Sequence, residues 1–233
     1  MSDPAAVGSV SMLFAQPTGP SAGILFMACV GLAGAGLCLL SELLIGRTLP
    51  RLGGSPTVRM RITTAAVTFA LSTLLAWRFG LAPELAAYVL LAASGVQLAR
   101  IDLLHHLLPN RMVLPLLGAG LVLLGAAAGV SGEAGSLLRG VASAAILFVL
   151  YLFLALTSRN GLGMGDVKLA APLGLYLGYL GWSQLFYGGA LGFVAGGLAS
   201  VVVVLKNRGN KPREVPYGPS MLAAGLAVIL LLR

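Results

Sequence analysis

Long apolar stretches with very few charges constrain this chain more than any other feature. Of its 233 residues, 58% are hydrophobic and 9% are charged, which leaves too little polar surface for a water-soluble globule. A transmembrane helix needs about 20 consecutive apolar residues, and about eight such stretches fit, with seven as an alternative count. The sequence therefore predicts an all-α membrane protein, a polytopic bundle of about eight transmembrane helices, at residues 22–45, 62–78, 84–100, 112–130, 137–157, 167–181, 184–205 and 219–232.

The basic residues divide unevenly between the two sides of such a bundle. With the N-terminus outside, the cytoplasmic connections carry 12 of the 15 Lys and Arg residues, all except Arg78, Arg139 and Arg233. Cytoplasmic loops of membrane proteins are enriched in these residues, so we expect both termini on the extracytoplasmic side. The net charge of +8 is then explained by contact with anionic lipid rather than with nucleic acid.

Residues 1–21 are expected to form a flexible extracytoplasmic tail. The first 20 residues hold no Lys or Arg, so the basic segment of a cleaved signal peptide is missing from them. The transmembrane domain is expected to cover residues 22–233.

Two of the three aspartates border the apolar stretches. Asp166 closes the run Gly163-Met164-Gly165-Asp166, and Asp102 opens a segment that leads through two histidines to Pro109 and Asn110. Ionisable groups at membrane depth are costly and usually mark function, and the topology places both aspartates at the cytoplasmic boundary. Two convergent carboxyls that share a proton can hydrolyse a peptide, since one activates water while the other polarises the scissile carbonyl.

Each aspartate alone has a simpler explanation. An acid at a helix end can cap that helix, or it can pair with Lys168 or Arg100. Glu42, near the inner end of the first apolar stretch, is an alternative member of the catalytic pair. The joint occurrence of two aspartates on one side of the membrane favours catalysis over these alternatives.

We expect neither a metal nor an organic cofactor. The adjacent residues His105 and His106 would point about 100° apart in a helix, and no Cys or Glu stands at ligand spacing near them. Cys29 and Cys38 fall on opposite faces of a helix, so we expect buried, inert thiols rather than a disulfide.

Three segments, in this order, resemble the type IV prepilin peptidase family of membrane aspartyl proteases. They are Ile101-Asp102 through Leu107-Leu108-Pro109-Asn110, then Gly163-Met164-Gly165-Asp166-Val167-Lys168-Leu169, then Val215-Pro216-Tyr217-Gly218-Pro219. The resemblance covers roughly residues 22–233 and implies that Asp102 and Asp166 are the catalytic pair. It also implies residues that position the motif or the substrate, namely Gly163, Gly165, Lys168, Pro109, Asn110, Pro216, Gly218 and Pro219.

The resemblance further implies a reaction and a location. The substrates would be type IV prepilins or pseudopilins, whose basic leader is cut at the cytoplasmic face of a bacterial plasma (inner) membrane. Many bacterial members carry, between the first two spans, a domain with paired Cys-x-x-Cys motifs that is associated with N-methylation. The corresponding connection here, residues 46–61, holds no cysteine, so we expect no methyltransferase activity. Membrane lipids are expected partners, nucleic acid is not, and the oligomeric state stays open.

Two other functions remain open from the sequence. An intramembrane protease of signal-peptide-peptidase type would use the same acids but cut deeper within a transmembrane helix. A proton- or cation-coupled transporter would use them to relay protons or bind cations. A purely structural role gives no reason for acids at the membrane edge.

Overall fold

The computed structural model describes residues 20–48, 57–157, 163–206 and 217–232, and the regular structure in these ranges is entirely α-helical. Within these ranges eight helices follow one another: α2 (Pro20–Thr48), α3 (Val58–Phe79), α4 (Leu85–His105), α5 (Asn110–Ser131), α6 (Ala134–Thr157), α7 (Met164–Leu180), α8 (Trp182–Lys206) and α9 (Gly218–Leu231). They match the eight predicted apolar stretches one for one, which confirms the all-α fold. Residues 1–19, most of the predicted tail, lie outside the described residues.

The helices differ in whether they are long enough to cross a membrane. Within the described residues, α2, α3, α4, α5 and α6 meet the criteria of length and apolar composition. With 17 and 14 residues, α7 and α9 extend only about 25 Å and 21 Å, less than the roughly 30 Å of a hydrocarbon core. Large apolar side chains such as Leu25, Phe186 and Leu198 are exposed on the outer helices. The protein is therefore an integral membrane protein.

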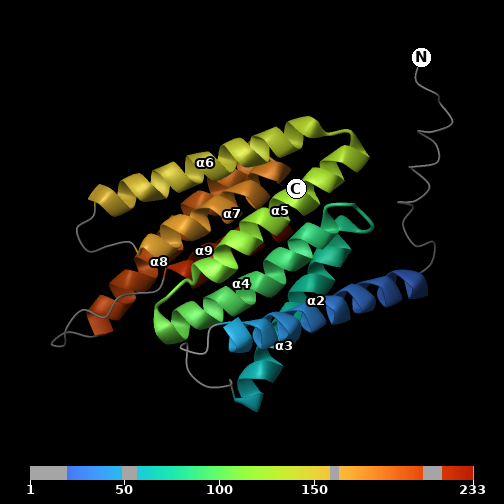
Figure 1. Cartoon of the computed structure of the whole chain (residues 1–233), viewed down its shortest axis with the longest axis horizontal. Helices are drawn as coiled ribbons and strands as arrows, with labels where there is room; N and C mark the ends of the chain where they lie inside the picture. The colour runs from blue at the N-terminus through green and yellow to red at the C-terminus, as the bar shows by residue number, and fades with distance from the viewer. Residues whose placement is uncertain (1–19, 49–56, 158–162, 207–216, 233) are drawn as a thin grey trace.

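The interior of the bundle consists mainly of α4, α7 and α9. Most residues of these three helices are buried, and the other helices lie around them (Figure 1). In α7 the buried residues include polar Asp166 as well as apolar side chains on every face. A helix that is apolar all round belongs inside a bundle, which is where α7 lies.

Small residues allow the closest helix pairs to form. A methyl group added at Gly178 of α7 would overlap the side chain of Ser143 on α6, and one at Gly34 of α2 would overlap Ser72 on α3. Without a hydrophobic driving force in lipid, helices associate through such close packing. Gly34 and Gly178 therefore allow close packing of α2 on α3 and of α6 on α7.

Two arginines hold the ends of the short helices. Arg139 donates from Nε to the carbonyl of Gly178 at 2.7 Å and from Nη2 to that of Tyr179 at 2.6 Å. Arg78 donates in the same way to two carbonyls at the end of α9. The last carbonyls of a helix have no hydrogen-bond donor within the helix. The two arginines supply donors to these carbonyls at the ends of α7 and α9.

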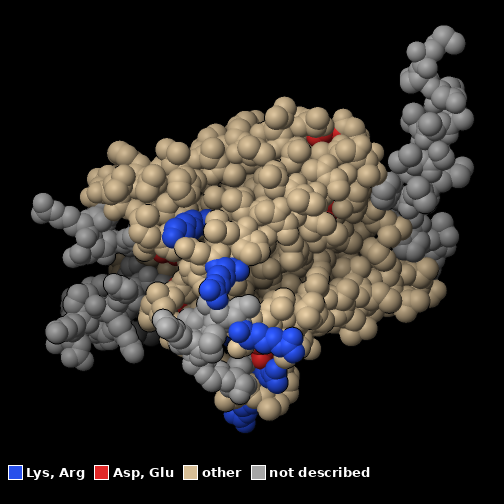
Figure 2. Space-filling view, viewed as in Figure 1, with Lys and Arg blue, Asp and Glu red and all other residues tan. Residues whose placement is uncertain are grey.

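Positive charge gathers toward one end of the bundle. On the face drawn in Figure 2, the Lys and Arg side chains lie toward the end where α3 begins, α4 ends and α5 begins. The sequence likewise predicts that most Lys and Arg residues lie on one side of the bundle.

Candidate active site

Three helix ends meet at the two predicted aspartates. Asp102 lies in the last turn of α4 and Asp166 in the first turn of α7, and they are only 4% and 7% exposed. Gly218, the first residue of α9, contacts Asp102. Segments from three distant parts of the sequence therefore form one site.

The start of α7 places Asp166. Gly163 precedes the helix in an extended conformation, and Asp166 is the third helical residue. Its carboxyl accepts a hydrogen bond from the backbone N–H of Gly163. An acid at this position that reaches back to the cap residue forms half of a capping box, so Asp166 does cap a helix, as its simpler explanation proposed, while also facing Asp102.

The start of α9 places a hydrogen-bond donor beside both carboxyls. The backbone N–H of Gly218 donates to Oδ2 of Asp102 at 3.1 Å. This N–H is free because the first N–H groups of a helix have no partner within it, and the positive end of the helix dipole favours a carboxylate there. The same N–H also acts on the carboxyl of Asp166, so both acids lie close to one donor.

The surroundings of Asp166 favour a bound proton near neutral pH. Burial raises the pKa of Asp166 to about 7, and the negative charge of Asp102 acts in the same direction. The N–H groups of Gly163 and Gly218 partly oppose this rise. A carboxyl that keeps its proton at neutral pH can serve as a general acid beside an ionised partner.

Two of the predicted glycines are required by close approach. A methyl group added at Gly218 would lie 2.7 Å from Oδ2 of Asp102, and one at Gly165 would lie 2.9 Å from Cβ of Leu108. Leu108 would also lie 3.3 Å from the methyl group at Gly218, so its side chain packs over both glycines. In the sequence Leu108 stands only as part of a motif, and nothing in that pattern indicates this contact.

The remaining predicted positions surround the pair less directly. Lys168 donates from Nζ to Oδ1 of Asn110 at 3.0 Å and so links α7 to α5. Pro109 is the cap residue before α5, and Pro219 follows Gly218 in the first turn of α9. Pro216 lies outside the described residues.

The alternatives for the two aspartates fare differently. Glu42 pairs with Arg61 and with Arg100 rather than with either aspartate. Arg100 therefore pairs with Glu42 on the face of α4 opposite Asp102. Lys168 donates a hydrogen bond to Asn110 instead of pairing with an aspartate. Within the described ranges, no Lys or Arg forms an ion pair with Asp102 or Asp166.

The histidines and cysteines contribute no metal cluster to the described part of the chain. His105 and His106 are both exposed, and no three His, Cys, Asp or Glu side chains there are placed to share an ion. Cys38 is buried as expected. The expectation for Cys29 was wrong, because its side chain is exposed on the outer surface of α2, where an apolar helix face needs no protein cover.

The amino-acid sequence is similar to that of a known protein family. The sequence model of the type IV leader peptidase family matches residues 88–201. That range begins in α4 and ends in α8, and it contains both aspartates.

Several similar relatives are named prepilin leader peptidase/N-methyltransferase. That of Stutzerimonas stutzeri is 32% identical over 160 residues, 69% of this chain and 54% of the relative. That of Pseudomonas aeruginosa is 32% identical over 165 residues, 70% and 55%. That of Aeromonas hydrophila is 33% identical over 175 residues, 73% and 57%. This chain thus spans little more than half the length of these relatives. No solved structure matches it.

Proposed function

This chain belongs to the type IV leader peptidase family through residues 88–201, and on that premise we propose that it is a membrane-embedded aspartyl endopeptidase. Its substrates are type IV prepilins or pseudopilins, from which it removes the basic leader. Asp102 and Asp166 are the catalytic pair. The observation that supports this most strongly is the meeting of two buried carboxyls, from α4 and α7, around the N–H of Gly218.

The two carboxyls have distinct roles in the proposed reaction. Asp102, held by the N–H of Gly218, is the ionised base and removes a proton from water as its oxygen attacks the scissile carbonyl carbon. Asp166, whose pKa is raised to about 7 by burial and by the charge of Asp102, donates its proton to the carbonyl oxygen. Asp102 then returns its proton to the leaving amine as the C–N bond breaks, and Asp166 recovers its proton from the collapsing diol.

The site is proposed to face the cytoplasm across a bacterial inner membrane, with the N-terminus on the other side. In support, the carboxyls lie at helix ends rather than in the middle of spans. The visible Lys and Arg side chains gather toward that same end (Figure 2), as expected of a cytoplasmic surface. A site at the boundary suits cleavage between a polar leader and an apolar helix, whereas a signal-peptide-peptidase-type enzyme would cut within the helix.

Cleavage without N-methylation is part of the proposal. The relatives are named as both peptidase and N-methyltransferase, but residues 46–61 of this chain hold no cysteine. The new N-terminus of a processed substrate is therefore expected to carry no methyl group added by this protein.

Co-expression with a candidate prepilin tests the proposal. The wild-type chain should yield a product whose N-terminus, read by mass spectrometry, lies at the leader boundary. Asp102→Asn and Asp166→Asn should each abolish the product while the protein stays in the membrane. Glu133→Gln is the matched control, since Glu133 lies exposed beyond the far end of α5.

Other outcomes would refute parts of the proposal. Processing that persists in either Asn variant would remove that aspartate from the mechanism. A cut inside the apolar helix would favour the deeper-cutting class of protease. Acid-dependent ion flux in proteoliposomes, without any new substrate N-terminus, would favour a transporter.

A further inference from the structure

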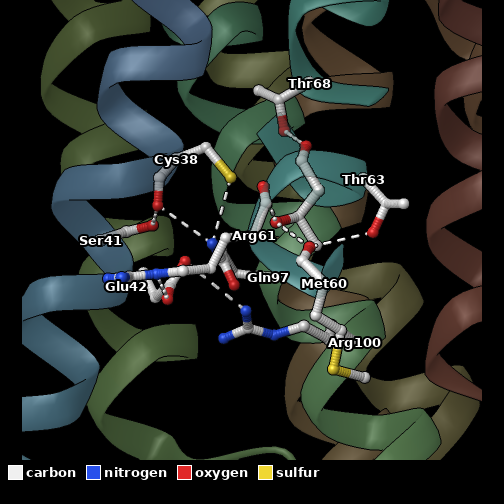
Figure 3. A network of polar contacts seen from close by, with 10 residues as sticks. Cys38, Ser41, Glu42, Met60, Arg61, Thr63, Thr68, Gln97 and Arg100 are labelled. Carbon is white, nitrogen blue, oxygen red and sulfur yellow. Dashed lines mark hydrogen bonds and ion pairs between the residues drawn. The ribbon is translucent and has the colours of Figure 1, made fainter. Parts of the chain in front are cut away.

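A second buried polar cluster lies on the face of α4 opposite Asp102. It joins α2, α3 and α4 around the carboxylate of Glu42 (Figure 3). Arg61 of α3 contacts Oε1 of Glu42 from Nε at 2.7 Å, and Arg100 of α4 contacts Oε2 from Nη1 at 3.7 Å. The side chain of Glu42 is only 2% exposed and that of Arg100 only 10%.

The cluster connects α2 and α4 at two successive levels. Gln97 donates from Nε2 to the backbone carbonyl of Cys38 at 3.0 Å, and Arg100 pairs with Glu42 beyond it. Cys38 and Glu42 are four residues apart, and Gln97 and Arg100 are three apart, so each pair occupies one face of its helix. Sliding or rotating α4 against α2 by one residue would break both levels.

This arrangement bears on Asp102 because Asp102 and Arg100 share the end of α4. Residues two apart in a helix point about 200° apart, and accordingly Arg100 contacts α2 whereas Asp102 contacts Gly218 of α9. The end of α4 is thus held from opposite sides. A rotation of α4 that carried Asp102 away from Gly218 would also separate Arg100 from Glu42.

We propose that Glu42 and Arg100 are positioning residues that hold α4 in the register at which Asp102 faces Asp166. The inference rests on the proposed function, because it assigns the two residues to the same reaction without direct contact with the substrate. Glu42, considered from the sequence as a substitute catalytic acid, instead acts through Arg100.

The pair is sensitive to the loss of one member. Within the described residues, Oε2 of Glu42 and Nη1 of Arg100 are buried without a hydrogen-bond partner, so the charge of Arg100 is compensated across the 3.7 Å separation, whereas Glu42 is also paired with Arg61. Removing one partner of a buried pair leaves an uncompensated charge, whereas replacing both partners avoids it. Glu42→Gln, which leaves Arg100 uncompensated, is therefore expected to be more damaging than the double variant, and more damaging than Arg100→Gln, in which Glu42 keeps Arg61.

The test uses the full chain, purified in lipid nanodiscs, with a prepilin substrate. Variants Glu42→Gln and Arg100→Gln should lower kcat per folded molecule by on the order of 100-fold, as expected for an acid misplaced by about 1 Å, with little change in KM. Arg100→Lys, which keeps the charge, should recover part of the loss. The double variant Glu42→Gln/Arg100→Gln should lie between Glu42→Gln and the wild type, because it removes the uncompensated charge of Arg100.

A pH–rate profile separates positioning from simple structural support. When Asp102 moves away, its charge acts less on Asp166, so the upper limb of the profile should shift to lower pH in the single variants. A loss of folded protein alone would leave the shape of the profile unchanged. Arg59→Gln and Glu133→Gln, both at exposed positions, are matched controls and should leave kcat and the profile unchanged.

The outcomes distinguish this inference from the proposed function. If Asp102→Asn is inactive while the folded single variants keep wild-type kcat and profile, the positioning role is refuted and the peptidase proposal stands. Should the single variants not fold, the double variant decides, since wild-type kcat and profile in it would equally refute the role. If Asp102→Asn still cleaves, the proposed mechanism itself fails.

Discussion

The substitution Gly218→Ala tests whether the start of α9 is built around the carboxyl of Asp102. Gly218 does not have a positive φ, so its backbone accepts alanine, and alanine is favoured over glycine in helices by up to about 1 kcal/mol. The added methyl group, however, would lie 2.7 Å from Oδ2 and 3.3 Å from Cγ of Asp102. Ordinary contact begins at 3.4 Å, so the separation from Oδ2 must widen by about 0.7 Å.

That displacement gives the expected size of the effect. A misplacement of about 1 Å in a catalytic group costs about 100-fold in rate, so we expect kcat to fall by roughly 10- to 100-fold. The 3.1 Å hydrogen bond from the Gly218 N–H to Asp102 would also weaken, and bonds to a charged group contribute about 1.5–3 kcal/mol. The assay is the initial rate of prepilin cleavage per folded molecule in nanodiscs.

Two other glycines calibrate the result. Gly118→Ala in α5 is the matched control, because nothing lies within 4 Å of the added methyl group. Gly163→Ala should be milder than Gly218→Ala, since its methyl group would lie 3.3 Å from Oδ2 of Asp166. If Gly218→Ala were as active as Gly118→Ala, the close approach of α9 to Asp102 would not matter for catalysis, and the reasoning would be refuted.

Two further predictions concern pH and stability. Because burial and the charge of Asp102 raise the pKa of Asp166 to about 7, Asp166 loses its proton as pH rises through that value, and kcat/KM should fall above it; a flat profile between about pH 6 and 9 would contradict the assigned acid role. Arg139→Gln removes two hydrogen bonds, of 2.7 Å and 2.6 Å, from the end of α7 and should lower stability by roughly 2–4 kcal/mol. Its melting temperature in nanodiscs, compared with that of Arg59→Gln, checks this, and equal values would show that the cap is dispensable.

Much of the fold was predictable because membrane insertion acts on local composition. Each apolar stretch must form a helix to satisfy its own backbone in lipid, so the stretches predict the helices directly. Asp102 and Asp166 were identifiable for the same reason, since a charge beside such a stretch is costly without a role.

The partners of individual polar groups were not predictable in this way. Sequence proximity suggested that Lys168 or Arg100 pairs with an aspartate, but Lys168 contacts Asn110 and Arg100 contacts Glu42. These contacts depend on how each helix is rotated about its axis. That rotation is set by packing against neighbours that are distant along the chain.

The amino-acid sequence by itself determined that this protein is a bundle of membrane helices, and it identified the two aspartates that stand out against the apolar background. Tertiary structure alone decided that the ends of α4, α7 and α9 meet, so that the N–H of Gly218 lies beside both carboxyls, and that Glu42 belongs to a separate cluster. The physical reason is that hydrophobicity and backbone hydrogen bonding act within one segment. Helix register and rotation arise instead from close contacts between segments that the order of residues does not reveal.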